Sequence, residues 1–205
     1  PLSAIEAVKS VTGADKVNMT GYCLGGIMLQ STLSYLTAVG QDKQINTATF
    51  FTTHQDFSDA GDVSVFISEP EVRFLENLMD ISGGYLDGRN MASTFSMLRA
   101  NDLIWPYVVN NYMLGKQPQA LDLLYWNSDG TRVPKRCHMF LLRNFFLDPK
   151  FSKPGFKLKG VFTNLHKVNV DSYAVTANTD LIVPWPGAFR IRDTTDSPVR
   201  FVLAE

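Results

Sequence analysis

The feature that most constrains the fold is the segment GYCLGG at residues 21–26. Before it stands KVNMT, which has the composition of a short strand, and after it IMLQSTLSYLTAV, whose apolar residues recur at helical spacing. A chain that passes from a strand into a helix through so tight a turn needs small residues beside the central one. The Gly-x-Cys-x-Gly spacing is typical of a nucleophile elbow with cysteine at its centre. The segment therefore predicts a strand, a strained turn and a helix.

The alternation of helix and strand extends over the first 53 residues. Residues 3–12 have an amphipathic helical pattern, and residues 45–53, INTATFFTT, have the β-branched and aromatic composition of a buried strand. Helix, strand, turn, helix and strand in succession are the mark of a mainly parallel sheet. Together with the elbow, this order predicts an α/β-hydrolase fold whose first part covers residues 1–54.

The strand signals stop in the middle of the chain and return near its end. Residues 55–143 are rich in helix formers and large apolar side chains, which predicts a mostly helical cap insertion. Residues 144–205 contain a short extended piece at 159–162 and strand patterns at 171–177 and 198–203, so they predict the second part of the α/β-hydrolase core. The last residues stop within a strand pattern and the first is not Met, so we expect the fold to be truncated at both ends.

Composition narrows the class of protein. The 205 residues are 45% hydrophobic and carry a formal net charge of -1, which suits one sizeable core and argues against nucleic acid as a partner. Two cysteines without a Cys-x-x-Cys pair favour a reducing compartment, the cytoplasm. No apolar run reaches the length of a membrane span, and no signal peptide is evident.

Cys23 is the candidate nucleophile because the predicted turn lifts its thiol above the sheet edge. Gly21 and Gly25 are expected to remove side chains that would clash with the turn, and the helix that follows is expected to favour the thiolate. The backbone N–H of Leu24 is then placed to stabilise an oxyanion. The alternative is a buried cysteine in a glycine-rich turn. Cys137, in contrast, is expected to be a structural thiol of the insertion.

A thiol nucleophile needs a base and an acid that orients the base. Asp180 is the best acid candidate because it follows a predicted strand directly; the alternative is a carboxylate that caps a loop or helix. In this fold the histidine comes last in the chain, yet the three histidines all precede Asp180. We therefore expect the base beyond residue 205. His54 is a weaker candidate, and its alternative is a surface or cap-hinge histidine. The remaining two, His138 and His166, have no spacing that indicates a triad or metal ligands, and no metal site is expected.

Five segments together resemble the polyhydroxyalkanoate synthases, and class I most closely. They are GYCLGG, TTHQDFSDAGDV at 52–63, MASTFSMLRANDLIWPYVVNNYMLGKQP at 91–118, LDLLYWNSDGTRVP at 121–134 and NTDLIVPW at 178–185. They extend over nearly the whole chain and are far more specific than the elbow alone.

The resemblance implies an acyltransferase that polymerises (R)-3-hydroxyacyl-CoA, 3-hydroxybutyryl-CoA in class I, and releases CoA. Cys23 would carry the polyester as a thioester and Asp180 would be the catalytic Asp. The family's catalytic His follows the sequence RFVL, here residues 200–203, so it is expected outside these 205 residues and the isolated fragment is expected to be inactive. No metal or organic cofactor is implied, since CoA enters as part of the substrate.

The resemblance also implies roles for the cap insertion. Arg99, Asn101, Asp102, Trp105 and Asp129 match motif residues of the family and are candidates for substrate or cap contacts; hydrogen bonding within the cap is the alternative for each. The family's cap supports a homodimer, and its members work in the cytoplasm at polyester granules.

Two other functions remain open at this point. A Cys-nucleophile α/β-hydrolase, such as a thioesterase or a polyester depolymerase, would share the elbow and the acid, but it has no reason to carry the segments NDLIWPYVV and DLLYWNSD. A non-catalytic synthase-associated protein would not need a complete nucleophile elbow.

Overall fold

A computed structural model describes residues 1–58, 60–118 and 120–205. The chain divides into two compact units: unit 1 comprises Pro1–Val65 and Arg143–Glu205, and unit 2 comprises Phe66–Leu142. The sequence places the first boundary at residue 54, but residues 55–65 belong to unit 1. Phe57 explains the difference, because its buried ring packs at 4.7 Å from the ring of Phe146 and at 5.5 Å from that of Phe145, both in unit 1.

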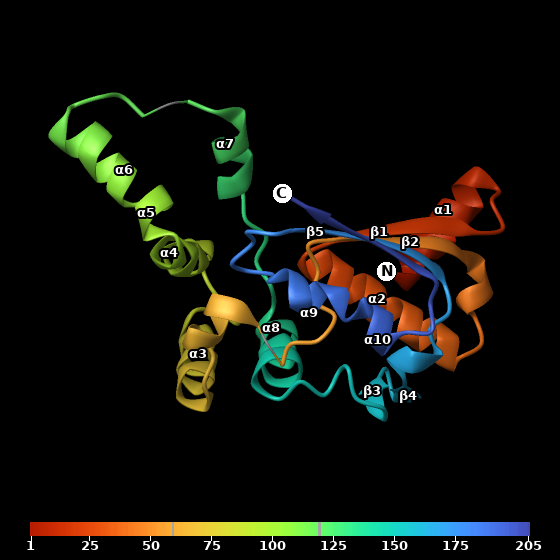
Figure 1. Cartoon of the computed structure of the whole chain (residues 1–205). Coiled ribbons are helices and arrows are strands. Elements are labelled where there is room, and N and C mark those ends of the chain that lie inside the picture. Colours follow the sequence, from red (N-terminus) through yellow and green to blue (C-terminus); the bar gives the residue numbers. More distant parts are fainter. Residues whose placement is uncertain (59, 119) are drawn as a thin grey trace. The chain divides into compact units, whose positions relative to one another are not determined.

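Unit 1 is built on a four-stranded sheet in which every pairing is parallel. Its strands are β1 (Val17–Tyr22), β2 (Ile45–Phe51), β5 (Asp171–Ala177) and β6 (Val199–Ala204), in the order β1-β2-β5-β6 (Figure 1). Tyr22 pairs with Phe51 and Phe51 with Val175, so three strands reach their carboxyl ends at the same level. The predicted parallel sheet is confirmed, and its carboxyl edge gathers the loops that follow β1, β2 and β5.

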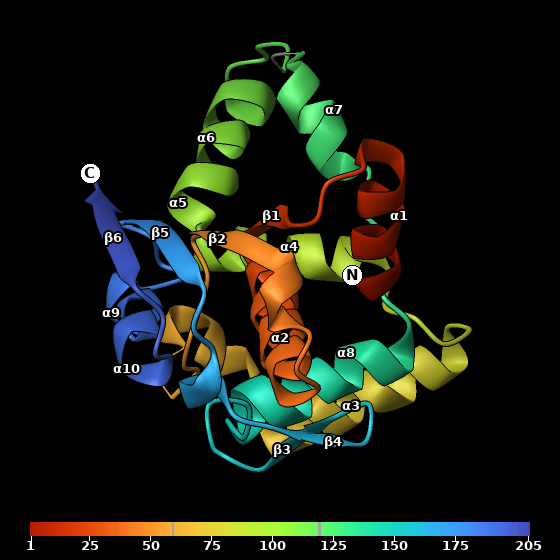
Figure 2. The ribbon, with the colours of Figure 1, turned by 90° about the vertical axis from the view of Figure 1, so that its right-hand side faces the viewer.

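The helices of unit 1 are α1 (Leu2–Thr12), α2 (Leu24–Ala38), α9 (Trp185–Phe189) and α10 (Ile191–Thr194). Figures 1 and 2 show α2, α9 and α10 on one face of the sheet. Buried aliphatic and aromatic side chains of α2, β2 and β5 form the core together with α1 and α10; they include Ile5, Leu29, Leu33, Leu36, Ala48, Phe50, Ala174 and Ile191. Burying such side chains supplies most of the driving force for this packing.

A small hairpin and several single turns complete unit 1. β3 (Phe156–Leu158) and β4 (Val161–Thr163) pair antiparallel, so the extended piece expected at 159–162 contains the hairpin turn instead of a single strand. Lys159 and Gly160 both have positive φ there, the backbone conformation that a tight hairpin turn requires. The 3-10 turns within unit 1 are η1 (Asp42–Gln44) and η5 (Leu165–Lys167). The 3-10 turn η2 (Gly61–Phe66) and the π-helical turn η4 (Leu142–Leu147) each extend one residue into unit 2.

Unit 2 is helical, as the sequence predicts for the insertion. Its elements are α3 (Glu69–Ile81), α4 (Gly88–Leu98), α5 (Ala100–Leu103), α6 (Trp105–Tyr107), the π-helical η3 (Val108–Met113), α7 (Asp122–Ser128) and α8 (Lys135–Leu141). Lys135 ties α8 to α3, since its Nζ lies 2.6 Å from Asp80 Oδ1. In the described part of this unit, the β structure is limited to one isolated bridge, between Tyr85 and Pro134.

Candidate active site

Cys23 stands between β1 and α2 in a strained backbone conformation, with φ 50° and ψ -115°. Its N–H donates to the Phe51 carbonyl at 2.9 Å, and its own carbonyl accepts from Gly26 N at 2.9 Å. A positive φ is uncommon outside glycine and persists only where the surroundings enforce it. The strand, strained cysteine and helix therefore form the elbow that the segment GYCLGG predicts.

Two glycines make this turn possible, and only the first of them, Gly21, is one of the two expected. A Cβ at Gly21 would lie 2.5 Å from Gly26 Cα, and a Cβ at Gly26 would lie 2.0 Å from Thr53 Oγ1. A Cβ at Gly25 would meet no atom of the described residues within 4 Å. The steric role assigned to Gly25 was therefore wrong: that residue faces open space, whereas Gly26 faces the loop after β2.

Burial raises the pKa of the Cys23 thiol above its ordinary value. The Leu24 backbone N–H bonds to the sulfur and opposes this rise, whereas the negative charge of Asp180 adds to it. The expected preference for thiolate at the helix start is thus outweighed by desolvation. Cys23 is a neutral thiol at pH 7 in this arrangement, and it needs a base before it can act as a nucleophile.

Asp180 follows β5 at the same sheet edge and belongs to a tight turn. Its Oδ1 accepts from the N–H groups of Ile182 at 2.9 Å and Val183 at 3.0 Å. The carboxylate thus caps its own turn, which is the alternative role considered from sequence. The negative charge of Asp180 also helps to raise the pKa of the Cys23 thiol. The expectation that Cys23 and Asp180 share the carboxyl edge of one parallel sheet is confirmed.

His54 lies on the loop after β2, the strand between β1 and β5. The residue is 4% exposed, and its Nε2 lies 2.9 Å from the Ile182 carbonyl oxygen. A carbonyl oxygen only accepts, so Nε2 carries the proton and donates it. From sequence, His54 was considered as a base and, alternatively, as a surface or cap-hinge histidine; in the structure it is buried and supports the turn that contains Asp180.

Further contacts join the loop after β2 to the segment after Asp180. Asp56 Oδ2 accepts from Arg190 Nη1 at 3.1 Å, and the Gln55 N–H donates to the Gly187 carbonyl at 3.2 Å. A Cβ at Gly61 would lie 2.7 Å from Pro184 Cγ. Sequence reasoning gave these residues no role. The signal available was the run DFSDAG at residues 56–61, which begins a few residues after a predicted strand.

The remaining sequence candidates lie in unit 2, apart from His166. Arg99 and Asp102 form an ion pair with each other, with Arg99 Nε 2.7 Å from Asp102 Oδ2, in agreement with the alternative of bonding within the insertion. The side chains of Asn101, Trp105 and Asp129 are exposed.

The other cysteine and histidines stand in ordinary surroundings. Cys137 is exposed on α8, so it does not pack as a core thiol. Burial lowers the pKa of His138 on the same helix. His166 is exposed in η5, which precedes the amino end of β5, at the opposite edge of the sheet from Cys23.

Across residues 1–58, 60–118 and 120–205, three or more His, Cys, Asp or Glu side chains nowhere gather as they would around a metal ion. Over the same residues, each helix is too short or too polar to cross a bilayer.

Comparison with known proteins identifies the relatives of this chain. No family model matches it. It is 44% identical over 201 residues to the poly(3-hydroxyalkanoate) polymerase subunit PhaC of Rhizobium meliloti, and 44% identical over 202 residues to the poly(3-hydroxyalkanoate) polymerase of Methylorubrum extorquens. The corresponding subunit of Cupriavidus necator is 36% identical over 207 residues.

The chain belongs to the poly(3-hydroxyalkanoate) polymerase family. Each of the three alignments covers 98% of this chain but only 33–35% of the relative, so the chain spans about a third of the length of the polymerases it matches. The resemblance inferred from the five sequence segments is confirmed.

Solved structures agree on the fold. A putative hydrolase from Agrobacterium vitis S4 superposes with a TM-score of 0.50 at 12% identity, covering 98% of this chain and 56% of that one. A putative non-heme bromoperoxidase from Mycobacterium tuberculosis H37Rv gives 0.50 at 10% identity, covering 98% and 63%. Identities this low concern the fold alone. With the parallel sheet and the elbow, they establish the predicted α/β-hydrolase fold.

Proposed function

We propose that this chain is the part of a class I poly(3-hydroxyalkanoate) polymerase that carries the nucleophile. The enzyme would transfer the acyl group of an (R)-3-hydroxyacyl-CoA, 3-hydroxybutyryl-CoA in the first instance, to a growing polyester and release CoA. The observation that carries the proposal is the strained Cys23 elbow beside Asp180, within a chain that matches polymerases over 98% of its length.

The proposed reaction has two acyl transfers. In the first, the Cys23 thiol gives its proton to a base and its sulfur attacks the thioester carbonyl; the bond to CoA breaks, and CoA leaves as the thiol with that proton. In the second, a hydroxyl group gives its proton to the base and its oxygen attacks the Cys23 thioester. The ester bond forms, and Cys23 recovers its proton. A thiol nucleophile suits this substrate, because a thioester exchanges for another thioester at little cost in energy.

We propose a histidine outside these 205 residues as the base. The Nε2 proton of His54 is engaged with Ile182, and His166 precedes β5 at the far edge of the sheet. The raised pKa of Cys23 makes the reaction depend on that base. Asp180 would orient the imidazole and stabilise its protonated form, as the acid of a triad does.

The other residues of the elbow shape the site. The Leu24 N–H, which lowers the pKa of the Cys23 thiol, would stabilise the oxyanion of each tetrahedral intermediate. Gly21 keeps the turn tight, and Gly25 leaves the space beside it open. No metal or organic cofactor takes part in the proposed reaction. In unit 2 we retain Arg99, Asp102, Trp105 and Asp129 as candidates for contacts with substrate.

We further propose that the polymerase is a homodimer in the cytoplasm, at the surface of polyester granules. Unit 2 supports an apolar association, because several of its large apolar side chains are more than 65% exposed: Phe74, Ile81, Tyr112, Met113, Leu123, Tyr125 and Trp126. Exposed apolar groups on this scale indicate contact with a partner or with the polymer.

The test is CoA release from 3-hydroxybutyryl-CoA by a full-length polymerase that contains this chain. Cys23→Ala should abolish release, and Cys137→Ala, its matched control, should retain most of it. Turnover of Cys23→Ala within tenfold of the parent contradicts the assignment. The product separates the two candidate chemistries: polyester indicates a polymerase, and free 3-hydroxybutyrate alone indicates a hydrolase.

A further inference from the structure

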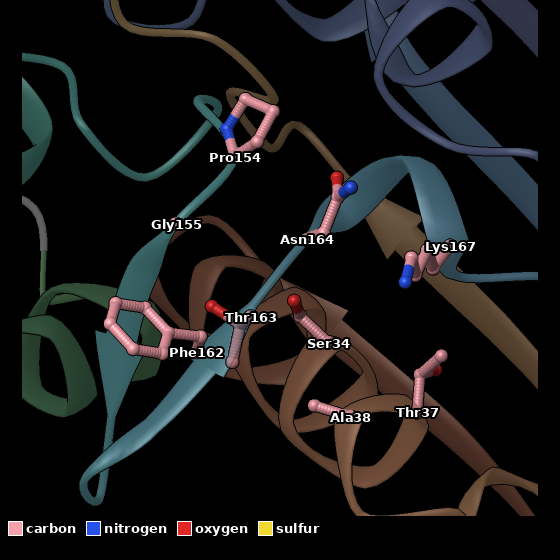
Figure 3. A pocket seen from close by; sticks show the side chains of 9 residues that line it. All are labelled: Ser34, Thr37, Ala38, Pro154, Gly155, Phe162, Thr163, Asn164 and Lys167. Atoms are coloured by element: carbon pink, nitrogen blue, oxygen red, sulfur yellow. The ribbon is translucent and has the colours of Figure 1, made fainter.

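A pocket of about 250 Å³ lies between the C-terminal half of α2, the β3–β4 hairpin and η5, all within unit 1. Figure 3 shows side chains from these elements around it. The lining residues are Ser34, Thr37, Ala38, Pro154, Gly155, Phe162, Thr163, Asn164 and Lys167. Cys23 precedes the other end of α2, a helix of 15 residues and therefore about 22 Å long, so this pocket is separate from the candidate active site.

Two hydroxyl groups beside the pocket are buried and have no partner among the described residues. Ser34 is 1% exposed, and neither its Oγ nor the buried Oγ1 of Thr37 forms a hydrogen bond within the described residues. Serine and threonine in helices commonly bond to the carbonyl four residues earlier, as Thr32 of the same helix does with Met28 at 2.7 Å. Buried polar atoms are nearly always paired. The two hydroxyl groups are therefore available to a ligand in the pocket.

The rim of the pocket is positive. Lys167 enters no ion pair within the described part of the chain, and Figure 3 shows its amine facing the Ser34 hydroxyl across the pocket. Asn164 uses its Oδ1 to accept from the His166 N–H at 3.0 Å, which leaves the amide NH₂ as a donor. No carboxylate is among the lining residues. A cation and several hydrogen-bond donors without a counter-charge favour an anion.

We propose that this pocket binds a small oxyanion, a phosphate or a short carboxylate, through Lys167 and the hydroxyl groups of Ser34 and Thr37. Its volume is below the roughly 300–1,000 Å³ of sites for larger ligands and cofactors. It also exceeds by far the roughly 30 Å³ that one water molecule occupies. Ala38, Pro154 and Phe162 add an apolar wall that suits a ligand with a short hydrocarbon part. The proposal does not depend on the polymerase function.

The test is calorimetric titration of the whole protein with inorganic phosphate and, separately, with acetate and 3-hydroxybutyrate. Lys167→Gln should weaken binding about tenfold or more, and Ser34→Ala several-fold. The matched control is Lys157→Gln, a lysine of the β3–β4 hairpin whose side chain lies over the Phe162 ring and does not line the pocket. Its affinity should equal that of the parent. Binding of phosphate alone, or of the two carboxylates alone, identifies which kind of anion the pocket accepts. Either result supports the proposal.

Three results would overturn the proposal. The first is no binding of any of the three anions at millimolar concentration. The second is an equal loss of affinity in Lys157→Gln and Lys167→Gln, which indicates diffuse attraction to a basic surface. The third is equally tight binding of glycerol, which indicates that charge is not recognised.

If Ser34→Ala unfolds, Thr37→Val replaces it. Hydrogen exchange then gives a second readout, since a bound anion should slow exchange at residues 34–38 and 161–167, and unchanged exchange contradicts the site.

Discussion

Gly26 and Thr53 are in direct contact across the base of the elbow: a Cβ at residue 26 would stand 2.0 Å from the Thr53 hydroxyl oxygen and 2.7 Å from its Cβ. Thr53 is held in turn, because its Oγ1 donates to the Phe51 carbonyl at 3.0 Å. The contact fixes how closely the start of α2 approaches the loop after β2. It therefore sets the height of Cys23 above the sheet.

We expect Gly26→Ala to destabilise the protein by about 1–3 kcal/mol, the usual cost of overpacking a tight contact. Gly25→Ala is the matched control, since a Cβ there meets none of the described atoms within 4 Å and alanine favours a helix. Its stability should equal or slightly exceed that of the parent. Urea unfolding of the two variants measures the difference, and equal stability would show that the contact relaxes at no cost.

The rate at which Cys23 is alkylated should reveal the raised pKa of its thiol. Because burial raises its pKa, iodoacetamide should modify Cys23 at pH 7.5 more slowly than a cysteine in a short peptide, and the rate should keep rising above pH 9. Asp180 contributes to that rise, so Asp180→Asn should shift the profile to lower pH. Mass spectrometry that separates the peptides of Cys23 and Cys137 gives both rates. A profile that does not move in Asp180→Asn contradicts the electrostatic coupling.

The same pKa shift has a consequence for stability. A thiol whose folded-state pKa is raised contributes stability that is fully present below the unfolded-state value of about 8.5 and is lost as pH rises through the folded-state value. The parent should therefore lose more stability between pH 8 and pH 10 than Cys23→Ala does. Urea unfolding at several pH values checks this, and parallel curves would mean that Cys23 does not titrate differently in the two states.

The sequence predicts those features of the fold and the site that depend on the local pattern of residues. The elbow, the parallel sheet and the placement of Asp180 follow from residue spacing along single elements, because the carboxyl ends of parallel strands meet at one edge. The roles of Gly26 and His54 depend instead on contacts between the loops after β1, β2 and β5. These loops are far apart in the sequence, and no local periodicity reports such contacts.

The glycines of the elbow show this limit most clearly. The Gly-x-Cys-x-Gly spacing favoured Gly25, yet in the structure the close approach occurs one residue later, where the first turn of α2 faces Thr53. Likewise, the start of a helix beside a cysteine favours the thiolate. In the structure, however, burial of the Cys23 sulfur removes solvent from it, and this desolvation decides the direction of the pKa shift. The burial of a side chain depends on how the elements pack together, which the local sequence pattern does not show.

His54 should stabilise the turn that contains Asp180. His54→Phe removes the donor to the Ile182 carbonyl and leaves a partly buried acceptor unpaired, which costs about 1–3 kcal/mol. His54→Gln can place an N–H near the same point and should recover part of the loss. The exposed His166 provides the control, because His166→Ala should change stability by less than about 0.5 kcal/mol. Urea unfolding of the three variants decides whether the hydrogen bond, and not merely the ring, supports the turn.

The proposed dimer should depend on the exposed apolar side chains of unit 2. Ile81 is 87% exposed and Tyr112 is 88% exposed, and a partner that covers them gains the free energy of their burial. Val11 on α1 is 86% exposed and belongs to unit 1, so it is a control of equal exposure outside the proposed interface. In the full-length polymerase, Ile81→Ser with Tyr112→Ser should raise the dimer dissociation constant about tenfold or more, and Val11→Ser should leave it unchanged. Sedimentation velocity over a range of concentrations measures the dissociation constant of the parent and of both variants.

A strict monomer in the parent contradicts the dimer itself. A dimer weakened only by Val11→Ser places the interface in unit 1 and leaves the assignment of Cys23 intact.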